Sequence, residues 1–383
     1  MTAEVRLPGG ETYRLTGGTA FVRPAGPPTS RIAYAAAHVV ADPTAENVPG
    51  APAVLDWETT LAFRHHLWSH GFGVAEAMDT AQRGMGLDHA ATRELIRRSA
   101  AEARSVGGRI VAGVNTDHLP PGSYPVAELT AAYRTQLEEV LTAGARPVLM
   151  CSRHLAAAAT SADDYLTVYS ELLAASDEPV VLHWLGDMFD PALAGYWGAT
   201  DLDLAADTVV QLVKDHADKV DGIKISLLDA DREIALRRRL PAGVRLYTGD
   251  DFHYPELIRG DEQGYSDALL GIFAAIAPAA AAALAALDAG DSDTYERIMA
   301  PTVPLARHLF GAPTWHYKTG IVFLAWLTGH QEHFTMVAGQ QAGRSPAHLA
   351  RLLVLADRAG LLPDADRAAA RARAFFTVAG VAQ

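Results

Sequence analysis

Apolar and polar positions along the chain follow two rhythms. Short apolar runs, bounded by glycine, proline or charged residues, alternate with longer segments in which apolar residues recur every three or four positions. The short runs are typical of buried strands, and the longer segments are typical of amphipathic helices. Eight strand candidates follow one another in this order: RIAYAAAHVV, FGVAEAMD, RIVAGVNTDH, RPVLMCSRH, PVVLHWLG, DGIKIS, VRLYTGDD and GYSDALLGIFA.

The segments between these runs carry helix signals. In DWETTLAFRHHLWSHG, Asp56 is a candidate N-cap and Gly71 a candidate stop, and a second helix is predicted near residues 88–106. Strands that alternate with helices imply a parallel sheet, and eight such units in this length predict an α/β fold of the closed (β/α)8 TIM-barrel type. No G-x-G-x-x-G motif follows any of these strands, which argues against a dinucleotide-binding sheet.

The two ends of the chain differ from its middle. Residues 1–30 contain VRLPGGETYRL, which predicts a small hairpin turned at Gly9 and Gly10, followed by a linker rich in proline and glycine. We place the barrel in residues 31–290 and a C-terminal helical extension in residues 291–383. The extension is predicted to be broken at Pro301, Pro304, Pro313, Pro346 and Pro363.

One uncharged stretch, residues 268–287, is long enough to cross a bilayer. Roughly half of it is alanine, which is only weakly apolar, and Pro278 divides it. We therefore predict a buried strand followed by a core-facing helix rather than a membrane span.

Composition narrows the class of ligand. The chain has 383 residues, 49% of them hydrophobic, and a net charge of −13, which disfavours nucleic acid and anionic membranes as main partners. A small molecule is the expected ligand. The single cysteine, Cys151, cannot form an internal disulfide, and the N-terminus lacks the pattern of a secretory signal, so a cytoplasmic location is expected.

The predicted sixth strand, VDGIKISLLD, contains a lysine. Alternation places Ile223 and Ile225 on one face of this strand. Gly222, Lys224 and Ser226 lie on the other. An ammonium group on a buried strand has lost most of its water, which costs free energy unless the group is paired or neutralised. Lys224 could extend to the barrel mouth or pair with a carboxylate; alternatively its neutral amine forms an imine with a ketone or aldehyde.

Polar side chains gather at the predicted C-terminal ends of the strands, where the chemistry of such barrels is located. Each of them could simply reflect the polarity of loops, but their joint position on one rim favours an active site. In chain order they are His38, Asp79, Thr80, Asn115, Asp117, His118, Arg153, His154, His183, Trp184, Lys224, Ser226, Asp250, Asp251 and His253.

His183 is predicted to move protons for Lys224. It ends the preceding strand, and neighbouring strands lie about 4.8 Å apart, so its imidazole could reach an imine or a leaving hydroxyl. The alternative is a hydrogen-bonded structural histidine. Asp250 and Asp251 could bind a polyol or orient a base, or they could cap the helix that begins at YPELIRG.

Together these runs resemble the superfamily of class I aldolase barrels that contains dihydrodipicolinate synthase and N-acetylneuraminate lyase. GIK looks like the Schiff-base lysine motif of that group, YTGDD looks like its seventh strand, and GYSDALLGIFAAIAP is similar to its eighth strand and following helix. The likeness covers roughly residues 31–330 in order. DWETTLAFRHHLWSHGFGVAEAMDTAQRGMGLD and LHWLGDMFDPALAGYWG look like a branch labelled only as dihydrodipicolinate-synthase-like. The resemblance implies an imine on Lys224, no further cofactor, and a homo-oligomer.

The chain departs from this group at three places. His183 stands where the group has a tyrosine proton relay on the fifth strand. MDTAQRG replaces a loop of the type G-T-T-G-E that holds the carboxylate of pyruvate, and only Thr80 matches, so Arg83 or Arg153 could bind an acid group instead. SRH replaces the stretch YYN, which often reaches a neighbouring subunit, so the contacts between subunits are expected to differ.

The resulting hypothesis is a carbon–carbon or carbon–oxygen lyase, of aldolase or dehydratase type, that forms an imine between Lys224 and a small hydroxylated, sugar-derived keto compound. His183 moves the proton during retro-aldol cleavage or dehydration. The residues expected to bind the substrate are Asp79, Thr80, Arg83, Asn115, Arg153, His154, Ser226, Asp250 and Asp251.

Two other classes of protein fit part of the pattern. A metal-dependent hydrolase or class II aldolase could use the rim histidines with carboxylates as ligands, although no H-x-H or H-E-x-x-H spacing occurs. The histidines concerned are His38, His118, His154, His183 and His253. A non-enzymatic binding protein on the same barrel is the third alternative, but buried charges that serve no chemistry are costly.

TWHYKTGIVFLAWLTGHQEHF, in the predicted extension, is interpreted as a partly buried amphipathic helix. The alternative is that it brings Trp315, His316, Tyr317 or Lys318 near the barrel mouth.

Overall fold

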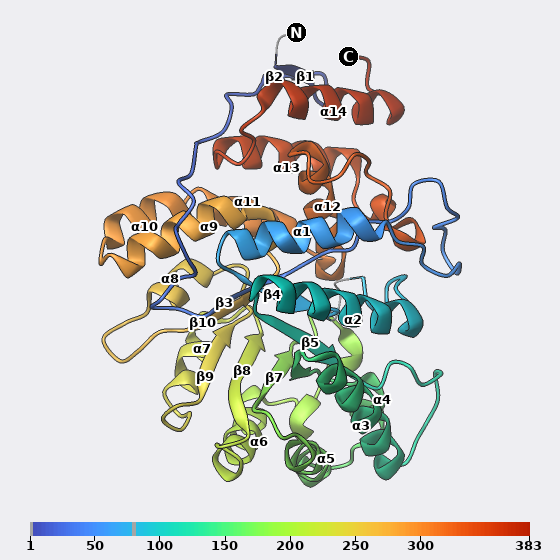
Figure 1. Ribbon diagram of the computed structural model, residues 1–383, viewed down its shortest axis with the longest axis vertical. Helices are drawn as coiled ribbons and strands as arrows, with labels where there is room; N and C mark the ends of the chain where they lie inside the picture. Colours follow the sequence, from blue (N-terminus) through green and yellow to red (C-terminus); the bar gives the residue numbers. More distant parts are fainter. Residues whose placement is uncertain (1–2, 79–81) are drawn as a thin grey trace.

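The computed structural model describes residues 3–78 and 82–383. Eight parallel strands pair in chain order, and β10 closes the barrel by pairing with both β9 and β3 (Figure 1). The barrel strands are β3 (Ala33–Ala36), β4 (Gly73–Glu76), β5 (Ile110–Val114), β6 (Arg146–Leu149), β7 (Val180–Leu185), β8 (Val220–Ser226), β9 (Arg245–Thr248) and β10 (Asp267–Leu270). Each of the eight predicted runs coincides with one of these strands; seven contain theirs whole, and β8 begins one residue before DGIKIS.

Helices follow the strands and cover the outside of the barrel. Asp56 caps the first of them by accepting a hydrogen bond from the backbone N–H of Thr59, as its position predicted. The helices are α1 (Trp57–Ser69), α2 (His89–Val106), α3 (Val126–Ala143), α4 (Arg153–Ala158), α5 (Ala162–Ala175), α6 (Leu202–Asp215), α7 (Ala230–Arg237), α8 (Tyr254–Arg259) and α9 (Phe273–Asp288). The predicted (β/α)8 barrel is confirmed.

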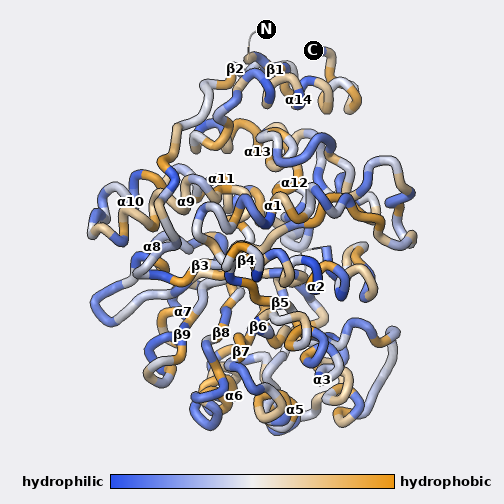
Figure 2. The backbone as a smooth tube through the Cα atoms, in the orientation of Figure 1, coloured by the Kyte–Doolittle hydropathy of each residue, from blue (hydrophilic) through white to orange (hydrophobic). Residues whose placement is uncertain are grey.

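Alternation along the strands separates two hydrophobic cores. Ala33 and Ala35 on β3 face the helices, whereas Tyr34 faces into the barrel. The barrel interior is filled by large side chains, including Tyr247 on β9, so the barrel is a packed core with its chemistry at the rim. Apolar segments run through the centre of the molecule, while the outer helices alternate between polar and apolar turns (Figure 2).

Pro304, one of the prolines predicted to break the extension, lies within a helix instead, and so does Pro278 in the barrel. Pro278 lies inside α9, and the backbone of Ile276 just before it departs from helical geometry. This departure near the start of the helix accommodates the ring and the missing N–H of the proline. Pro304 likewise lies within the first turn of α11, where a backbone N–H would have no helical acceptor. No helix among the described residues has both the length and the apolarity that a bilayer span requires.

The N-terminal hairpin packs against the C-terminal helices, and both chain ends lie on the same side of the molecule (Figure 1). Strands β1 (Glu4–Arg6) and β2 (Thr12–Arg14) pair antiparallel around the predicted turn at Gly9 and Gly10. The carboxylate of Asp357 accepts hydrogen bonds from the Tyr13 hydroxyl and from Thr16. The helices after α9 are α10 (Ser292–Met299), α11 (Thr302–Leu309), α12 (Tyr317–Leu327), α13 (Pro346–Arg358) and α14 (Ala365–Val378).

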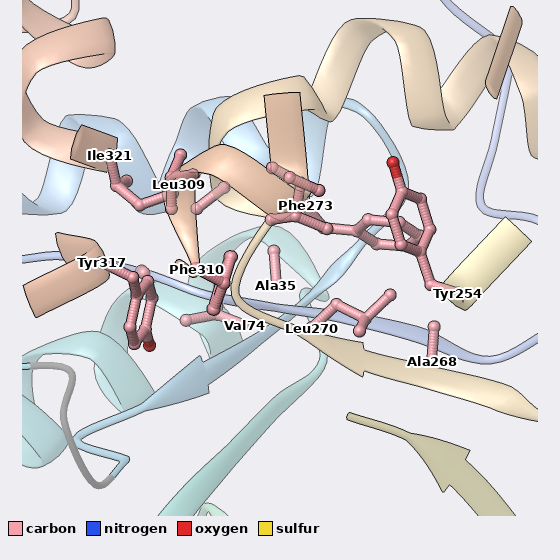
Figure 3. Packing of buried hydrophobic residues seen from close by; sticks show 14 of the residues in the cluster. Ala35, Val74, Tyr254, Ala268, Leu270, Phe273, Leu309, Phe310, Tyr317 and Ile321 are labelled. Atoms are coloured by element: carbon pink, nitrogen blue, oxygen red, sulfur yellow. The ribbon is translucent and has the colours of Figure 1, made fainter. Parts of the chain in front are cut away.

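Helix α12 connects this extension to the barrel. The Nζ of Lys318 donates a hydrogen bond to the carbonyl oxygen of Ala36, the last residue of β3. Tyr317 stacks on Phe310, with 4.4 Å between ring centroids, and both rings lie over the end of β10 (Figure 3). Gly271 permits this approach, because a Cβ there would lie 2.7 Å from the Phe310 ring and 2.9 Å from the Tyr317 ring.

Candidate active site

Lys224 and His183 lie side by side inside the barrel. Strands β7 and β8 pair so that His183 is directly opposite Lys224 and Leu182 is opposite Ile223. Only 8% of Lys224 and none of His183 is exposed to solvent. Because β7 and β8 are parallel, both side chains emerge at the same end of the barrel. The structure therefore brings together the two residues that the sequence analysis predicted as catalytic.

Gly249, which follows β9, leaves room for the lysine side chain. A Cβ at this position would lie 2.7 Å from Cε of Lys224 and 2.3 Å from Oγ of Ser226. Both distances are far below ordinary van der Waals contact, so a larger residue would displace the lysine or the serine. The YTGDD sequence thus has a steric role in addition to its polar residues.

The imidazole of His183 is held in a fixed position. Its Nε2 lies 3.1 Å from Oγ of Ser226, within hydrogen-bonding distance. Ser226 is two residues beyond Lys224 on the same strand and points to the same face. The backbone carbonyl of His183 also accepts a hydrogen bond from the thiol of Cys151 at 3.2 Å. The contact with Ser226 orients the ring toward the strand that carries the lysine.

Asp250 and Asp251 occupy the neighbouring rim but have different surroundings. Asp250 accepts hydrogen bonds from the backbone N–H groups of Phe252 and His253 and lies 2.9 Å from Nδ1 of His253. It therefore stabilises the turn before α8, the structural alternative considered for it. Asp251 is 4% exposed, and its Oδ1 accepts the backbone N–H of Ile272 at 2.8 Å.

The charge state of Asp251 is sensitive to its surroundings. Burial raises its pKa from 3.8 to about 7, although the N–H of Ile272 and the positive charge of Lys224 act in the opposite direction. Near neutral pH this carboxyl group is therefore divided between its acid and base forms. A group with that property can both donate and accept a proton at a substrate oxygen.

The polar groups after β5 and β6 mainly bind each other. The Asn115 amide donates to the carbonyl of Cys151, and its oxygen accepts the N–H of Thr116. Nδ1 of His154 lies 3.0 Å from Oγ1 of Thr116, and its Nε2 lies 3.2 Å from the carbonyl oxygen of Pro120. Asn115 and His154 therefore organise this part of the rim, and their role in substrate binding stays a prediction.

The two arginines expected to hold an acid group are engaged elsewhere. Nε and NH2 of Arg83 form a bidentate pair with Asp117 at 2.7 Å, and its remaining N–H groups bind Gln136 and the carbonyl oxygens of Ala77 and Gly113. All five donors of Arg83 thus have protein partners. Arg153 has 69% of its side chain exposed and pairs with Asp190. Arg83 would have to leave these contacts to bind a ligand, whereas the contact of Arg153 with Asp190 uses its Nε. Asp79 and Thr80 lie outside the described residues.

Lys318 is a second amine at the barrel mouth. It is 3% exposed and lies in a helix that is buried along nearly its whole length, not amphipathic as interpreted from the sequence. Burial and the charge of Arg64 lower the pKa of Lys318 from 10.5 to about 7, while Asp251 acts to raise it. The sequence signal was a single lysine in an otherwise apolar run, and the alternative placement near the mouth is the correct one.

The rim histidines are spread around the barrel rather than gathered. Among residues 3–78 and 82–383, no group of three or more histidine, cysteine, aspartate or glutamate side chains is arranged to hold a metal ion. His38 illustrates this: its Nε2 lies 3.0 Å from the amide oxygen of Gln331, and burial with the charge of Lys318 lowers its pKa well below 6.5.

Solved structures of dihydrodipicolinate synthases are similar to this fold. A putative dihydrodipicolinate synthetase from Pseudomonas aeruginosa matches with a TM-score of 0.64 at 14% identity, over 86% of this chain and 99% of that chain. The Aquifex aeolicus synthase matches with a TM-score of 0.65 at 13% identity, over 87% and 99%. The chloride-inhibited Acinetobacter baumannii synthase, complexed with pyruvate, matches with a TM-score of 0.61 at 17% identity, over 87% and 100%. At these identities the likeness shows the fold, and at that level the predicted resemblance is confirmed.

A search of curated proteins gave no match. A family model described as "Protein of unknown function (DUF993)" matches residues 6–381. Because the match extends over nearly the whole sequence, the chain belongs to the DUF993 family, whose barrel has the dihydrodipicolinate synthase fold.

Proposed function

We propose that this protein is a class I lyase that forms an imine between Lys224 and the carbonyl carbon of a small hydroxylated keto compound. The observation that supports this most directly is the register of β7 and β8, which sets a buried imidazole opposite a buried amine inside the barrel. Among the solved structures of this fold, one holds pyruvate, a small keto acid. A sugar-derived keto compound is our proposed substrate class.

Lys224 supplies the nucleophile. Its neutral amine adds to the substrate carbonyl, and loss of water gives a protonated imine. The positive nitrogen attracts electrons from the adjacent carbon, so a neighbouring bond can break toward it. In retro-aldol cleavage, the β-hydroxyl loses its proton, the Cα–Cβ bond breaks, and an aldehyde or ketone leaves behind an enamine. In dehydration, the Cα–H proton is removed and the β-hydroxyl leaves as water. After cleavage, a proton adds to the enamine carbon and regenerates the imine. In both reactions, hydrolysis of the imine then frees the product and the lysine amine.

His183 moves the proton in this scheme. It accepts the β-hydroxyl proton during cleavage, or donates one to the departing hydroxyl during dehydration. The hydrogen bond to Ser226 keeps the ring beside the imine carbon. Asp251 is the second group suited to proton exchange, since its pKa lies near 7. Asp250, Asn115 and His154 are proposed to contact substrate hydroxyls at the rim.

The proposal is tested by chemical trapping. The protein is incubated with pyruvate, 2-keto-3-deoxy sugar acids and neutral keto sugars, borohydride is added, and the modified peptide is identified by mass spectrometry. We expect an adduct on Lys224 that is absent from Lys224→Met. Lys219→Met is the matched control, because Lys219 precedes the same strand and donates to the carbonyl oxygen of Ser176. Full turnover of an identified substrate by Lys224→Ala would contradict the mechanism.

A further inference from the structure

Two buried polar side chains contact one short segment at the end of β3. Nζ of Lys318 donates to the carbonyl oxygen of Ala36, and Oε1 of Gln82 accepts the backbone N–H of Val39 at 2.6 Å. Ala36 and Val39 are three residues apart. Lys318 comes from α12 and Gln82 from the loop between β4 and α2. The segment 36–39 thus places two side chains that are distant in sequence on the same part of the barrel mouth.

Each of these two side chains has N–H groups for which the described residues supply no acceptor. The hydrogen bond from Val39 fixes the orientation of the Gln82 amide, so its Nε2 is the donor that points elsewhere. Within residues 3–78 and 82–383, this nitrogen is buried and has no hydrogen-bond acceptor. The ammonium group of Lys318 has three N–H groups, and the described part of the chain supplies Ala36 as an acceptor for one. An unpaired buried donor costs free energy, so a ligand that accepts from both would be stabilised.

A small cavity separates these donors from the C-terminal extension. The space in it that a water-sized group can reach is about 10 Å³, and it is lined by Gln82, Met85, Trp315, His316, Lys318, Thr319, Met336 and Gln340. That is room for about one water molecule, so this cavity suits a single small polar group such as one carboxylate oxygen. The charge of Lys224 acts on Lys318, and the charges of both act on Asp251, so Lys318 and the proposed imine lysine lie at the same end of the barrel.

We propose that Lys318 and Gln82 bind the carboxylate of the substrate, which makes the substrate a keto acid. This inference rests on the proposed imine at Lys224 and adds the chemical class of the compound. A carboxylate offers acceptor oxygens and a negative charge, which match the amide N–H groups of Gln82 and the N–H groups of Lys318 that do not bind Ala36. A hydroxyl group would satisfy one donor, but unlike a carboxylate it would bring no negative charge to the buried amine. Arg83 and Arg153 have no part in this site, because their guanidinium groups bind Asp117 and Asp190.

The site differs from a purely structural contact in a way that can be measured. If Lys318 only ties α12 to β3, its removal changes stability and affects acidic and neutral compounds alike. If it binds a carboxylate, its removal changes the selectivity between them. Pyruvate and hydroxyacetone form a suitable pair of probes, because they differ by a carboxylate and a hydroxymethyl group on the same ketone.

The experiment measures the rate of borohydride trapping at Lys224 with each probe in the wild type, Lys318→Met, Gln82→Glu and Lys219→Met. We expect Lys318→Met to lower trapping of pyruvate by roughly 10- to 100-fold and to leave hydroxyacetone nearly unchanged. Gln82→Glu keeps the acceptor for Val39 and replaces the unpaired donor with a negative oxygen, so it should also discriminate against pyruvate. Lys219→Met should trap both probes as the wild type does.

Equal loss of both probes in the Lys318 and Gln82 variants, or no loss of pyruvate, would overturn the carboxylate site while leaving the imine intact. Gln82→Glu is the independent test if Lys318→Met does not fold. If no compound gives an adduct in the wild type, the imine proposal fails separately. The carboxylate site is then tested by the effect of propionate on the thermal unfolding temperature. Propionate should raise this temperature in the wild type but not in Gln82→Glu. No increase in the wild type would overturn the site.

Discussion

Replacement of Glu233 by glutamine should remove a pH-dependent contribution to stability. Glu233 lies on α7, is 1% exposed, and accepts hydrogen bonds from the hydroxyls of Ser266 at 2.7 Å and Thr248 at 2.9 Å. Burial raises its pKa from 4.5 to about 8, although the two hydroxyls act to lower it. Glutamine has nearly the same shape as the protonated acid and cannot ionise, so Glu233→Gln isolates the cost of ionisation.

The sign and size of the effect follow from proton binding. Between pH 4.5 and 8, the folded protein holds a proton on Glu233 that the unfolded chain has released. The stability that this group contributes is fully present below pH 4.5 and is lost as the pH rises through 8. Each pH unit in this window costs about 1.4 kcal/mol, so the wild type should lose roughly 4 kcal/mol relative to Glu233→Gln between pH 5 and 8.

Urea unfolding of both proteins at pH 5, 6.5 and 8 measures this difference directly. Glu262→Gln, at an exposed position, controls for the loss of one carboxylate from the chain. Other buried groups such as Asp251 titrate in both proteins, so their contribution to the unfolding free energy drops out of the difference. A difference in unfolding free energy that stays constant from pH 5 to 8 would show that the pKa of Glu233 is not raised.

Three further substitutions test the site and its support. Gly249→Ala should reduce borohydride trapping at Lys224 more than tenfold without unfolding the protein, because the new Cβ would lie 2.7 Å from Cε of the lysine; unchanged trapping would exclude the steric role. Glu76→Gln should lower the free energy of unfolding in urea by about 3–5 kcal/mol, since it leaves the fully buried guanidinium of Arg64 without its bidentate partner at 2.8 Å. Asp251→Asn should abolish the limb of the pH–activity profile near pH 7; in the wild type, any step that needs the protonated acid slows as the pH rises through 7.

The barrel could be predicted because its strands and helices differ locally in their hydrophobic pattern. The pairing of His183 with Lys224 was also within reach, since consecutive strands of such a barrel are neighbours and alternation fixes the face of each residue. The division of the chain at residues 30 and 290 stays a prediction, as does the assignment of substrate contacts.

Lys318 was beyond the reach of local pattern for a physical reason. The residue that accepts its hydrogen bond, Ala36, lies 282 positions earlier in the chain, and nothing near Lys318 encodes that contact. Arg83 posed the opposite problem: its position after β4 suggested a ligand, but Asp117 and Gln136 use its donors. Both charged residues were named from the sequence as candidates near the barrel mouth. Their roles depend on contacts with residues that are distant in the sequence, which local pattern does not reveal.

The packing of the N-terminal hairpin against the C-terminal helices affects the order in which the chain folds. The backbone N–H of Arg6 binds the side chain of Gln383, a contact across 377 positions, and Arg373 donates to the carbonyl oxygen of Glu4. During synthesis the barrel strands can pair as they emerge, whereas β1 and β2 must wait for helices made after the whole barrel. Lys318 belongs to the same late part of the chain. The amine at the barrel mouth therefore arrives after Lys224 is in place, and newly made chains should pass through a stage with a formed barrel and an uncovered mouth.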